Sequence, residues 1–392
     1  VAREIPGELH ASALALDPGG RHLVCANAAS DNLSVIDVAT DTVVEKIWVK
    51  RSPADLFGAS PNALAFSSDG KTLYAANGTQ NALAVIRFDP DNRRSGLLGL
   101  IPTGWFPGAI VVDAEHNMLT VANIKGHAVE PQRDAATHGT GFNSHQYYGS
   151  LSLIPVPGHD ELQTMTKTVY DDFRKDRIAE AFEPPRPNRP PQPVPERIGE
   201  PSVFKHVVYV IKENRTYDQI LGDVEAGNGD PSLVLFGERV TPNQHKMVRE
   251  FALLDNTYCS GILSADGHQW STTAFGTDYL ERSFAGWPRS YPDGMGPDEI
   301  DALAYAPSGF IWDNALRHGV SVWNFGEFMM HACGWKDPAR KGDPEWKDYW
   351  EEFLQARGKV VIRSVPGIET IGPFSPGDTV GWNMAVPDVW LA

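Results

Sequence analysis

Two short segments in the second half of the sequence carry side chains that could do chemistry. Glu213 and Asn214 directly follow a β-branched run at 206–211, and Ser264 stands four positions before His268. A carboxylate and an amide at the C-terminal end of a strand can coordinate a divalent cation and orient a phosphate oxygen. The small residues around Ser264 would let a hydroxyl nucleophile approach a substrate closely. These residue types indicate a site that combines a cation, an anionic group and a nucleophile.

Each of these features also has a simpler interpretation. Glu213 and Asn214 fit a solvated, charged loop equally well. A serine near a histidine is weak evidence for nucleophilic catalysis when no third partner is identifiable, and His268 fits a structural histidine in a loop. The residues alone therefore leave both interpretations open.

The elements that would position these side chains follow a strand and helix alternation. The run at 206–211 is typical of a strand buried on both faces of a parallel sheet. Residues 243–254 predict a helix with Thr241 as its cap and Pro242 at its first position. A second helix over 310–318 and a strand over 320–325 follow. Such alternation predicts a mostly parallel sheet with helices on both faces and ligands at the C-terminal ends of its strands.

The order of these motifs resembles the alkaline phosphatase superfamily. It is most similar to the phosphoesterases that include bacterial phospholipases C and acid phosphatases. The motifs are a strand, Glu-Asn at 213–214, Thr-Pro-Asn at 241–243, a helix, Asp-Asn-x-Tyr at 255–258, and Ser264-x-x-x-His268. The resemblance implies an α/β alkaline-phosphatase-like domain that hydrolyses a phosphoester, either a small molecule or a phospholipid headgroup.

The same resemblance implies a role for each site residue. Ser264 would be the nucleophile, and Glu213 would bind a divalent metal ion, which could be zinc, manganese or calcium. Asn214 would donate to a phosphoryl oxygen, and His268 would donate to another oxygen or to the leaving group. The metal would make a serine hydroxyl reactive near neutral pH.

One departure from the family limits this expectation. Phosphoesterases of this type draw further Asp and His ligands from the C-terminal half of the domain, whereas no histidine follows His331 here. We expect the missing ligands to come from a further segment or chain, or the domain to be inactive. The alternative function is a non-catalytic propeller scaffold or binding protein with a vestigial or split phosphoesterase domain.

The first 125 residues contain an internal repeat. The segment at 13–20 recurs at 63–70, and each copy is followed by a short apolar strand and an Ala-Asn pair. A third, weaker copy begins at 109. Strands separated by Asp/Gly turns at a period near 50 predict β-propeller blades, with a β-sandwich as the alternative.

The copies resemble the YVTN-type repeats of bacterial surface and periplasmic propellers, which implies a periplasmic or secreted location. About three blades fit into residues 1–157, fewer than the four to eight of a closed propeller. We therefore expect the chain to be part of a larger protein, or a further polypeptide segment or chain to complete the propeller and the active site.

A proline-rich segment separates the two halves. Seven prolines between 184 and 195 impose an extended backbone. The sequence predicts propeller blades over 1–157, an exit helix near 171–182 and a linker over 158–200, and the phosphoesterase-like domain over 201–392.

Composition excludes several classes of protein. The 392 residues include 34 Lys and Arg against 50 Asp and Glu, for a net charge of −16. This balance argues against nucleic acid or an anionic membrane surface as the main partner. No apolar run approaches the roughly 20 residues of a membrane span. Three scattered cysteines do not form a disulfide framework.

Overall fold

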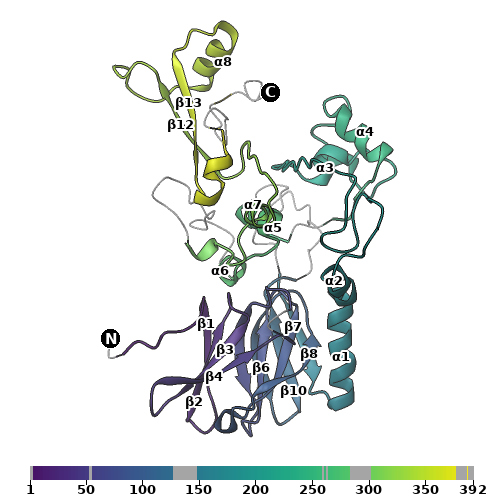
Figure 1. Ribbon diagram of the computed structural model, residues 1–392, viewed down its shortest axis with the longest axis vertical. Coiled ribbons are helices and arrows are strands. Elements are labelled where there is room, and N and C mark those ends of the chain that lie inside the picture. Colours follow the sequence, from purple (N-terminus) through teal and green to yellow (C-terminus); the bar gives the residue numbers. More distant parts are fainter. Residues whose placement is uncertain are drawn as a thin grey trace, which may run out of the picture.

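The computed structural model describes residues 3–52, 55–126, 148–257, 260–261, 264–282, 302–376 and 386. Within these residues, three antiparallel sheets stand side by side and are followed by helices and a smaller sheet (Figure 1). The strands of the three sheets are Ala11–Leu16 (β1), His22–Asn27 (β2), Asn32–Asp37 (β3), Thr42–Trp48 (β4), Pro61–Phe66 (β5), Thr72–Asn77 (β6), Ala82–Arg87 (β7), Gly96–Pro102 (β8), Pro107–Asp113 (β9), Met118–Asn123 (β10) and Ser150–Pro155 (β11).

The three sheets have the up-and-down strand order of propeller blades. We call them blade 1 (β1-β2-β3-β4), blade 2 (β5-β6-β7-β8) and blade 3 (β9-β10-β11). The first strands lie next to one another, β1 against β5 and β5 against β9. The predicted partial propeller of about three blades is therefore found, and the described sheets do not close into a ring.

The repeated Asp/Gly turns explain why the first hairpins of blades 1 and 2 form. In blade 1 the Asp17 carboxylate accepts hydrogen bonds from the backbone N–H groups of Arg21 and His22, at 2.7 and 3.0 Å. Gly20 has φ +69° and its counterpart Gly70 has φ +68°. Glycine occupies this left-handed region at little cost, so both turns can close tightly.

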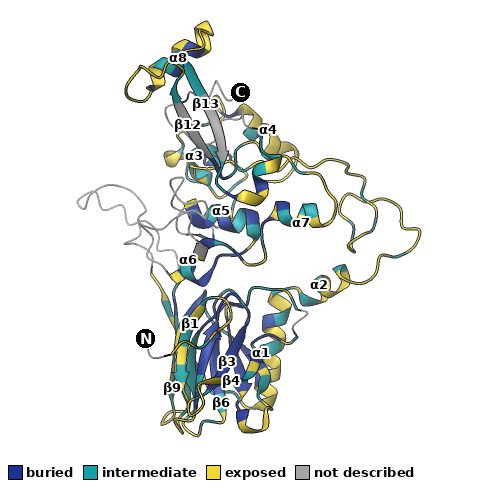
Figure 2. Ribbon diagram, turned by 60° about the vertical axis from the view of Figure 1, so that its left-hand side comes forward, coloured by how far each residue is buried: buried dark blue, intermediate teal, exposed yellow. Residues whose placement is uncertain are grey.

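The core of the propeller lies between its blades. One cluster joins blades 1 and 2 and includes Val24, Val35, Leu73 and Ile86. A second joins blades 2 and 3 and includes Leu83 and Leu119 among its members. Figure 2 shows β3 and β6 buried within the stack, with exposed residues on β1 and β9. The apolar alternation of the repeat thus becomes blade-to-blade packing.

Two helices leave the propeller where one was expected. Residues His159–Asp172 (α1) pack along β8, and Lys175–Ala181 (α2) follow after Arg174, which has φ +51°. The predicted exit helix at 171–182 is therefore the end of a longer helical segment. Beyond it the chain is mostly irregular, with one bridge between Gln192 and Ser202. The domain boundaries remain predictions.

The second half contains short helices and one small sheet. These elements are Tyr217–Leu221 (α3), Pro242–Glu250 (α4), Ser264–Thr273 (α5), Asp278–Arg282 (α6), Ile311–Arg317 (α7), Met329–Trp335 (β12), Trp346–Gln355 (α8) and Val360–Pro366 (β13). Pro242 opens α4 and Thr241 precedes it, as predicted. The Thr241 hydroxyl, however, donates to the Phe236 carbonyl oxygen at 2.8 Å and makes no capping bond.

The predicted parallel sheet is not found in the described residues. The run expected to be a buried strand is irregular and unpaired, and Val207 and Val208 are each 85% exposed. Residues 320–325 are not a strand either. The described part of 201–392 contains only the antiparallel pair β12–β13. β-branched residues favour a strand only when neighbouring strands pack against them, and no strand among the described residues pairs with this run. An alkaline-phosphatase-like domain is therefore not shown.

Candidate functional site

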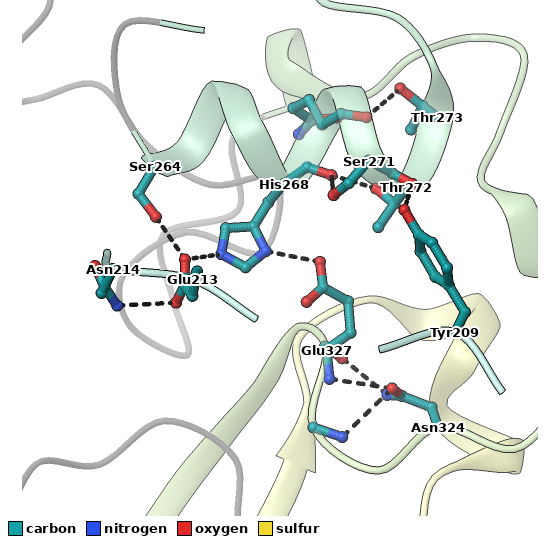
Figure 3. A network of polar contacts seen from close by, with 12 residues as sticks. Tyr209, Glu213, Asn214, Ser264, His268, Ser271, Thr272, Thr273, Asn324 and Glu327 are labelled. Atoms are coloured by element: carbon teal, nitrogen blue, oxygen red, sulfur yellow. Dashed lines mark hydrogen bonds and ion pairs between the residues drawn. The ribbon is translucent and has the colours of Figure 1, made fainter. Parts of the chain in front are cut away.

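Helix α5 presents two of the predicted site residues on one face. Ser264 opens the helix and His268 lies one turn later, a spacing that brings side chains together on a helix surface. The Ser264 hydroxyl donates to Glu213 Oε2 at 3.0 Å, and His268 Nε2 lies 2.9 Å from the same oxygen (Figure 3). One carboxylate oxygen therefore joins the serine and the histidine.

Glu213 reaches this position from an irregular segment. The Tyr209 hydroxyl donates to the backbone carbonyl of Ser271 at 3.0 Å, which fastens the segment to α5. Asn214 has φ +65°, and its Nδ2 donates to Glu213 Oε1 at 3.2 Å. The four residues predicted to form a site are thus brought together, although not at the end of a parallel strand.

A fifth residue, Glu327, was missed by the sequence analysis. Its Oε1 lies 2.8 Å from His268 Nδ1. Asn324 holds the turn that carries it, because Asn324 Nδ2 donates to the Glu327 carbonyl at 2.8 Å and Asn324 Oδ1 accepts from the Glu327 N–H at 3.1 Å. The signal that could have found it is the Asn-x-x-Glu spacing just before β12.

The two carboxylates control the charge of His268. Its side chain is 14% exposed, and this burial acts to lower the pKa of the imidazole. Hydrogen bonding and charge from Glu327, and then from Glu213, outweigh burial and raise the pKa of His268 above its ordinary value. The two carboxylates therefore stabilise the imidazolium form, and each ring nitrogen faces one of them.

Helix α5 is fixed to the propeller through a buried ion pair. Lys125, just beyond β10, pairs with Glu281 of α6, and both side chains are 1% exposed. Trp270 Nε1 of α5 donates to Glu281 Oε1 at 3.1 Å. At the end of α5, Phe275 packs on Phe57 with ring centroids 5.1 Å apart. The propeller thus sets the position of the helix that carries Ser264 and His268.

The donor set does not fit a metal ion as it stands. The described residues contain no group of three or more His, Cys, Asp and Glu side chains arranged to hold one. Both His268 nitrogens are engaged by carboxylates, so neither is directed at a common point with Glu213 and Glu327. The divalent metal expected at Glu213 stays a prediction, and no chemical step is derived through it.

The chain is similar to known propeller proteins. A family model described as "Lactonase, 7-bladed beta-propeller" matches residues 45–140, which is less than half of the chain. No curated protein matches. Together with the blade topology, the family match supports the β-propeller prediction.

Solved structures match at low similarity. Hydrazine synthase of Kuenenia stuttgartiensis is 19% identical, with 31% of this chain and 32% of that chain covered and a TM-score of 0.26. A candidate 6-phosphogluconolactonase of Bacteroides uniformis is 19% identical, with 30% of this chain and 34% of that chain covered and a TM-score of 0.27. A Lactobacillus plantarum protein is 28% identical, with 28% of this chain and 33% of that chain covered and a TM-score of 0.25. The chain spans about a third of the length of each of these structures.

The predicted function, a metal-dependent phosphoesterase, is wrong. The family match is to lactonase-type propellers, and it gives no support to a phosphoesterase. The physical reason for the error is that the motif order was interpreted as a parallel sheet. The described residues do not form that sheet.

No helix among the described residues is long and apolar enough to cross a membrane.

Proposed function

We propose that the chain is a propeller-based hydrolase that opens a lactone or a related carboxylic ester at the Glu213–Ser264–His268–Glu327 site. The observation that carries the proposal is the single oxygen, Glu213 Oε2, that lies within hydrogen-bond distance of both Ser264 Oγ and His268 Nε2. The match of residues 45–140 to a lactonase propeller family supports the carbonyl-ester substrate class. A periplasmic or secreted location belongs to the same proposal.

The hydrogen bonds assign a chemical role to each residue. Glu213 accepts the Ser264 proton while Ser264 Oγ attacks the ester carbonyl carbon, because a carboxylate in contact with a hydroxyl can act as a general base. His268, whose imidazolium form the two carboxylates stabilise, gives its Nε2 proton to the ring oxygen as the carbonyl C–O bond breaks. Water then attacks the acyl-serine carbonyl and gives a proton to the neutral His268. As the bond between the acyl carbon and Ser264 Oγ breaks, Glu213 returns its proton to Oγ, so the hydroxy acid leaves and all three side chains regain their starting forms. Glu327 holds His268 in its orientation and in its charged form.

The exposure of the site suits a substrate that arrives from solvent. Ser264 is exposed, and the Glu213 side chain is 32% exposed. His268 and Glu327 lie deeper, at 14% and 15%. The nucleophile is therefore outermost and the proton donor is shielded, the order that attack on an incoming carbonyl requires.

Hydrolysis assays with the full chain test this proposal. We expect turnover of a sugar-acid lactone or an activated carboxylic ester, unaffected by a chelator, and none of a phosphate monoester or diester. Ser264→Ala should lower kcat by roughly three orders of magnitude or more. The matched control is Ser271→Ala, on the same helix two turns later. Equal losses in both variants, or turnover of phosphoesters only, would refute the proposal.

A second function, a non-catalytic binding propeller, is favoured by one observation. His268 has a carboxylate at each nitrogen, which is also how a purely structural ion pair is built. In that case His268→Gln destabilises the fold while no lactone or ester is turned over by any form of the protein. Stability and hydrolysis measured on the same variant therefore separate the two functions.

A further inference from the structure

We propose that a basic cleft at the outer end of the β12–β13 pair binds a small dianion, either a phosphate group or a short dicarboxylate. The cleft has a volume of about 440 Å³, which is within the range of small-molecule sites. It lies where the chain leaves β12 and returns to β13, and Figure 1 shows these strands extending away from the propeller towards α8. The residues that line the basic cleft are Lys336, Asp337, Arg340, Gly358 and Lys359.

Two lysines of the cleft lie on the same side of the strand pair. The Lys336 N–H donates to the Lys359 carbonyl at 2.9 Å, one position beyond the last register pair of β12 and β13. Lys336 and Lys359 therefore stand opposite each other on neighbouring chain segments. Opposed residues of an antiparallel pair carry their side chains on one face, and like charges placed this way repel each other. An anion between the two ammonium groups would replace this repulsion with attraction.

Arg340 adds a third positive charge in a defined position. Its guanidinium carbon lies 3.9 Å from the centroid of the Trp335 ring, which is a cation–π contact. Such a contact uses none of the N–H donors of the guanidinium. Those donors can therefore bind two oxygens of a carboxylate or of a phosphate at once.

The carboxylates near the cleft do not neutralise its cations. Among the residues that the structure describes, none of the three cations of the lining forms an ion pair. Glu352 accepts from the backbone N–H groups of Gly358 and Lys359, the latter at 2.9 Å. Asp337 Oδ1 accepts from the Ala339 N–H at 2.9 Å. Three cations and one carboxylate leave the lining with a net charge of +2.

The charges around the cleft favour a small ligand over a polyanion. Residues 336–359 include six Lys and Arg and six Asp and Glu, so the segment as a whole is neutral. Helix α8 alone carries three acidic residues and one lysine. A nucleic acid or an anionic membrane would meet these acids as well as the cleft, which opposes its binding. A dianion held inside the cleft matches the charge of +2 without meeting them.

Calorimetric titration of the full chain tests the binding. At pH 8 and constant ionic strength, inorganic phosphate or succinate should bind about tenfold more tightly than acetate, because acetate brings only one negative charge. The tighter of the two dianions identifies the phosphate group or the dicarboxylate as the ligand. If neither dianion binds, or if acetate binds as tightly as both, the proposal is overturned.

Substitutions in the cleft should change the affinity with a sign that the charge sets. Arg340→Gln and Lys359→Gln should each raise the Kd about tenfold, because each removes one charged contact. Asp337→Asn should instead lower the Kd, since it removes the negative charge and keeps a backbone acceptor. Lys347→Gln is the matched control, because Lys347 is an exposed lysine of α8 that pairs with Glu345 outside the lining. An unchanged Kd in all the cleft variants would overturn the proposal.

Urea unfolding without ligand separates binding from a structural role. Arg340→Gln and Lys359→Gln alter exposed side chains, so the unfolding midpoint should stay at that of the parent. Ester hydrolysis should also stay unchanged, because Glu327 precedes β12 and the cleft follows it. Variants that lose stability but keep the affinity of the parent would show that these cations serve the fold, and they would overturn the proposal.

Discussion

Lys125 and Glu281 form an ion pair between the propeller and the region that carries the candidate site, and neither side chain is more than 1% exposed. Lys125 also donates to the Ser260 carbonyl, and Glu281 accepts from the indole of Trp270. Burial raises the pKa of the Glu281 carboxyl more than the charge of Lys125 lowers it. The pair therefore carries a desolvation cost that Lys125 and the hydrogen bonds offset only in part.

We predict that breaking this pair from one side is strongly destabilising. Lys125→Met leaves a buried carboxylate unpaired, which should lower the free energy of unfolding by about 3–5 kcal/mol. The double variant Lys125→Met, Glu281→Leu should be considerably more stable than Lys125→Met alone, because no buried charge remains. Urea denaturation of the full chain measures both.

The control for this prediction is an exposed ion pair. Lys167 and Asp171 pair at 2.5 Å on the surface of α1, with side chains 74% and 58% exposed. Lys167→Met should leave the unfolding midpoint unchanged, since solvent screens such pairs. If Lys125→Met proves equally harmless, the pair does not hold the two regions together.

The propeller could be predicted from the sequence because its information is local and repeated. Leu64 and Phe66 recur 50 positions after Leu14 and Leu16, and a strand pattern that occurs twice with the same turns is typical of stacked, repeated sheets. Blade 3 was harder, because its last strand begins at Ser150, far along the chain from β10.

The site could be predicted only in part. Ser264 and His268 were singled out by their residue types and motif order, but no helix was predicted there, and their place on one face of α5 comes from the structure. Glu327 lies 59 positions from His268, and its contact depends on how the turn before β12 folds back. The failed strand at 206–211 shows the limit more clearly. Its β-branched residues favour a strand, but a strand forms only where a neighbouring strand pairs with it. The sequence pattern does not reveal whether such a neighbour is present.

We predict that the stability contributed by His268 falls as pH rises. The folded pKa of His268 is raised above its ordinary value by Glu327 and Glu213, against the effect of burial. A group with a raised folded pKa stabilises the fold fully below its unfolded pKa, about 6.5, and that contribution is lost as pH rises through the folded pKa.

Urea unfolding of the parent and of His268→Gln over a pH series checks this. The stability difference between the two should be largest near pH 5.5 and should shrink towards pH 9. Glu327→Gln should lower the pKa of His268, as followed by NMR titration of the imidazole. A difference that grows with pH has the opposite sign and contradicts the assignment of His268 as an ion-paired imidazolium.

We predict different effects on hydrolysis from the two carboxylates of the site. Glu213→Gln removes the proposed base and should lower kcat by roughly 10²–10⁴-fold. Glu327→Gln should instead move the alkaline limb of the pH–rate profile to lower pH, because His268 then loses its proton more easily. The KM should change little in either variant. Identical pH profiles for the two variants would contradict separate roles as base and positioning residue.

The last prediction concerns Asp31, whose carboxylate ties blade 1 to the segment that enters blade 2. It accepts from the backbone N–H groups of Gly58 and Ala59 at 2.9 and 2.8 Å, and from Lys50 Nζ at 3.1 Å, with its side chain fully buried. Asn81 is the equivalent residue in the next repeat. Its side-chain oxygen accepts one hydrogen bond, from the backbone N–H of Phe106 at 2.8 Å. Both residues have positive φ, 53° and 51°, which Asp and Asn tolerate better than other side chains.

Substitutions at this position should therefore separate the charge from the hydrogen bonds. Asp31→Ala leaves the buried Lys50 ammonium without its carboxylate partner and removes the acceptor of several backbone N–H groups. It should therefore lower the free energy of unfolding by about 3–5 kcal/mol. Asp31→Asn keeps an acceptor and the positive φ but leaves Lys50 without its charge partner. It should therefore be intermediate, and adding Lys50→Met should recover part of the loss. Asp91→Ala, at an aspartate that is 54% exposed and paired with Arg21, is the control and should leave the unfolding midpoint unchanged. If Asp31→Asn is as stable as the parent, the backbone hydrogen bonds and not the ion pair hold the blade junction, and Lys50→Met alone should then be harmless as well.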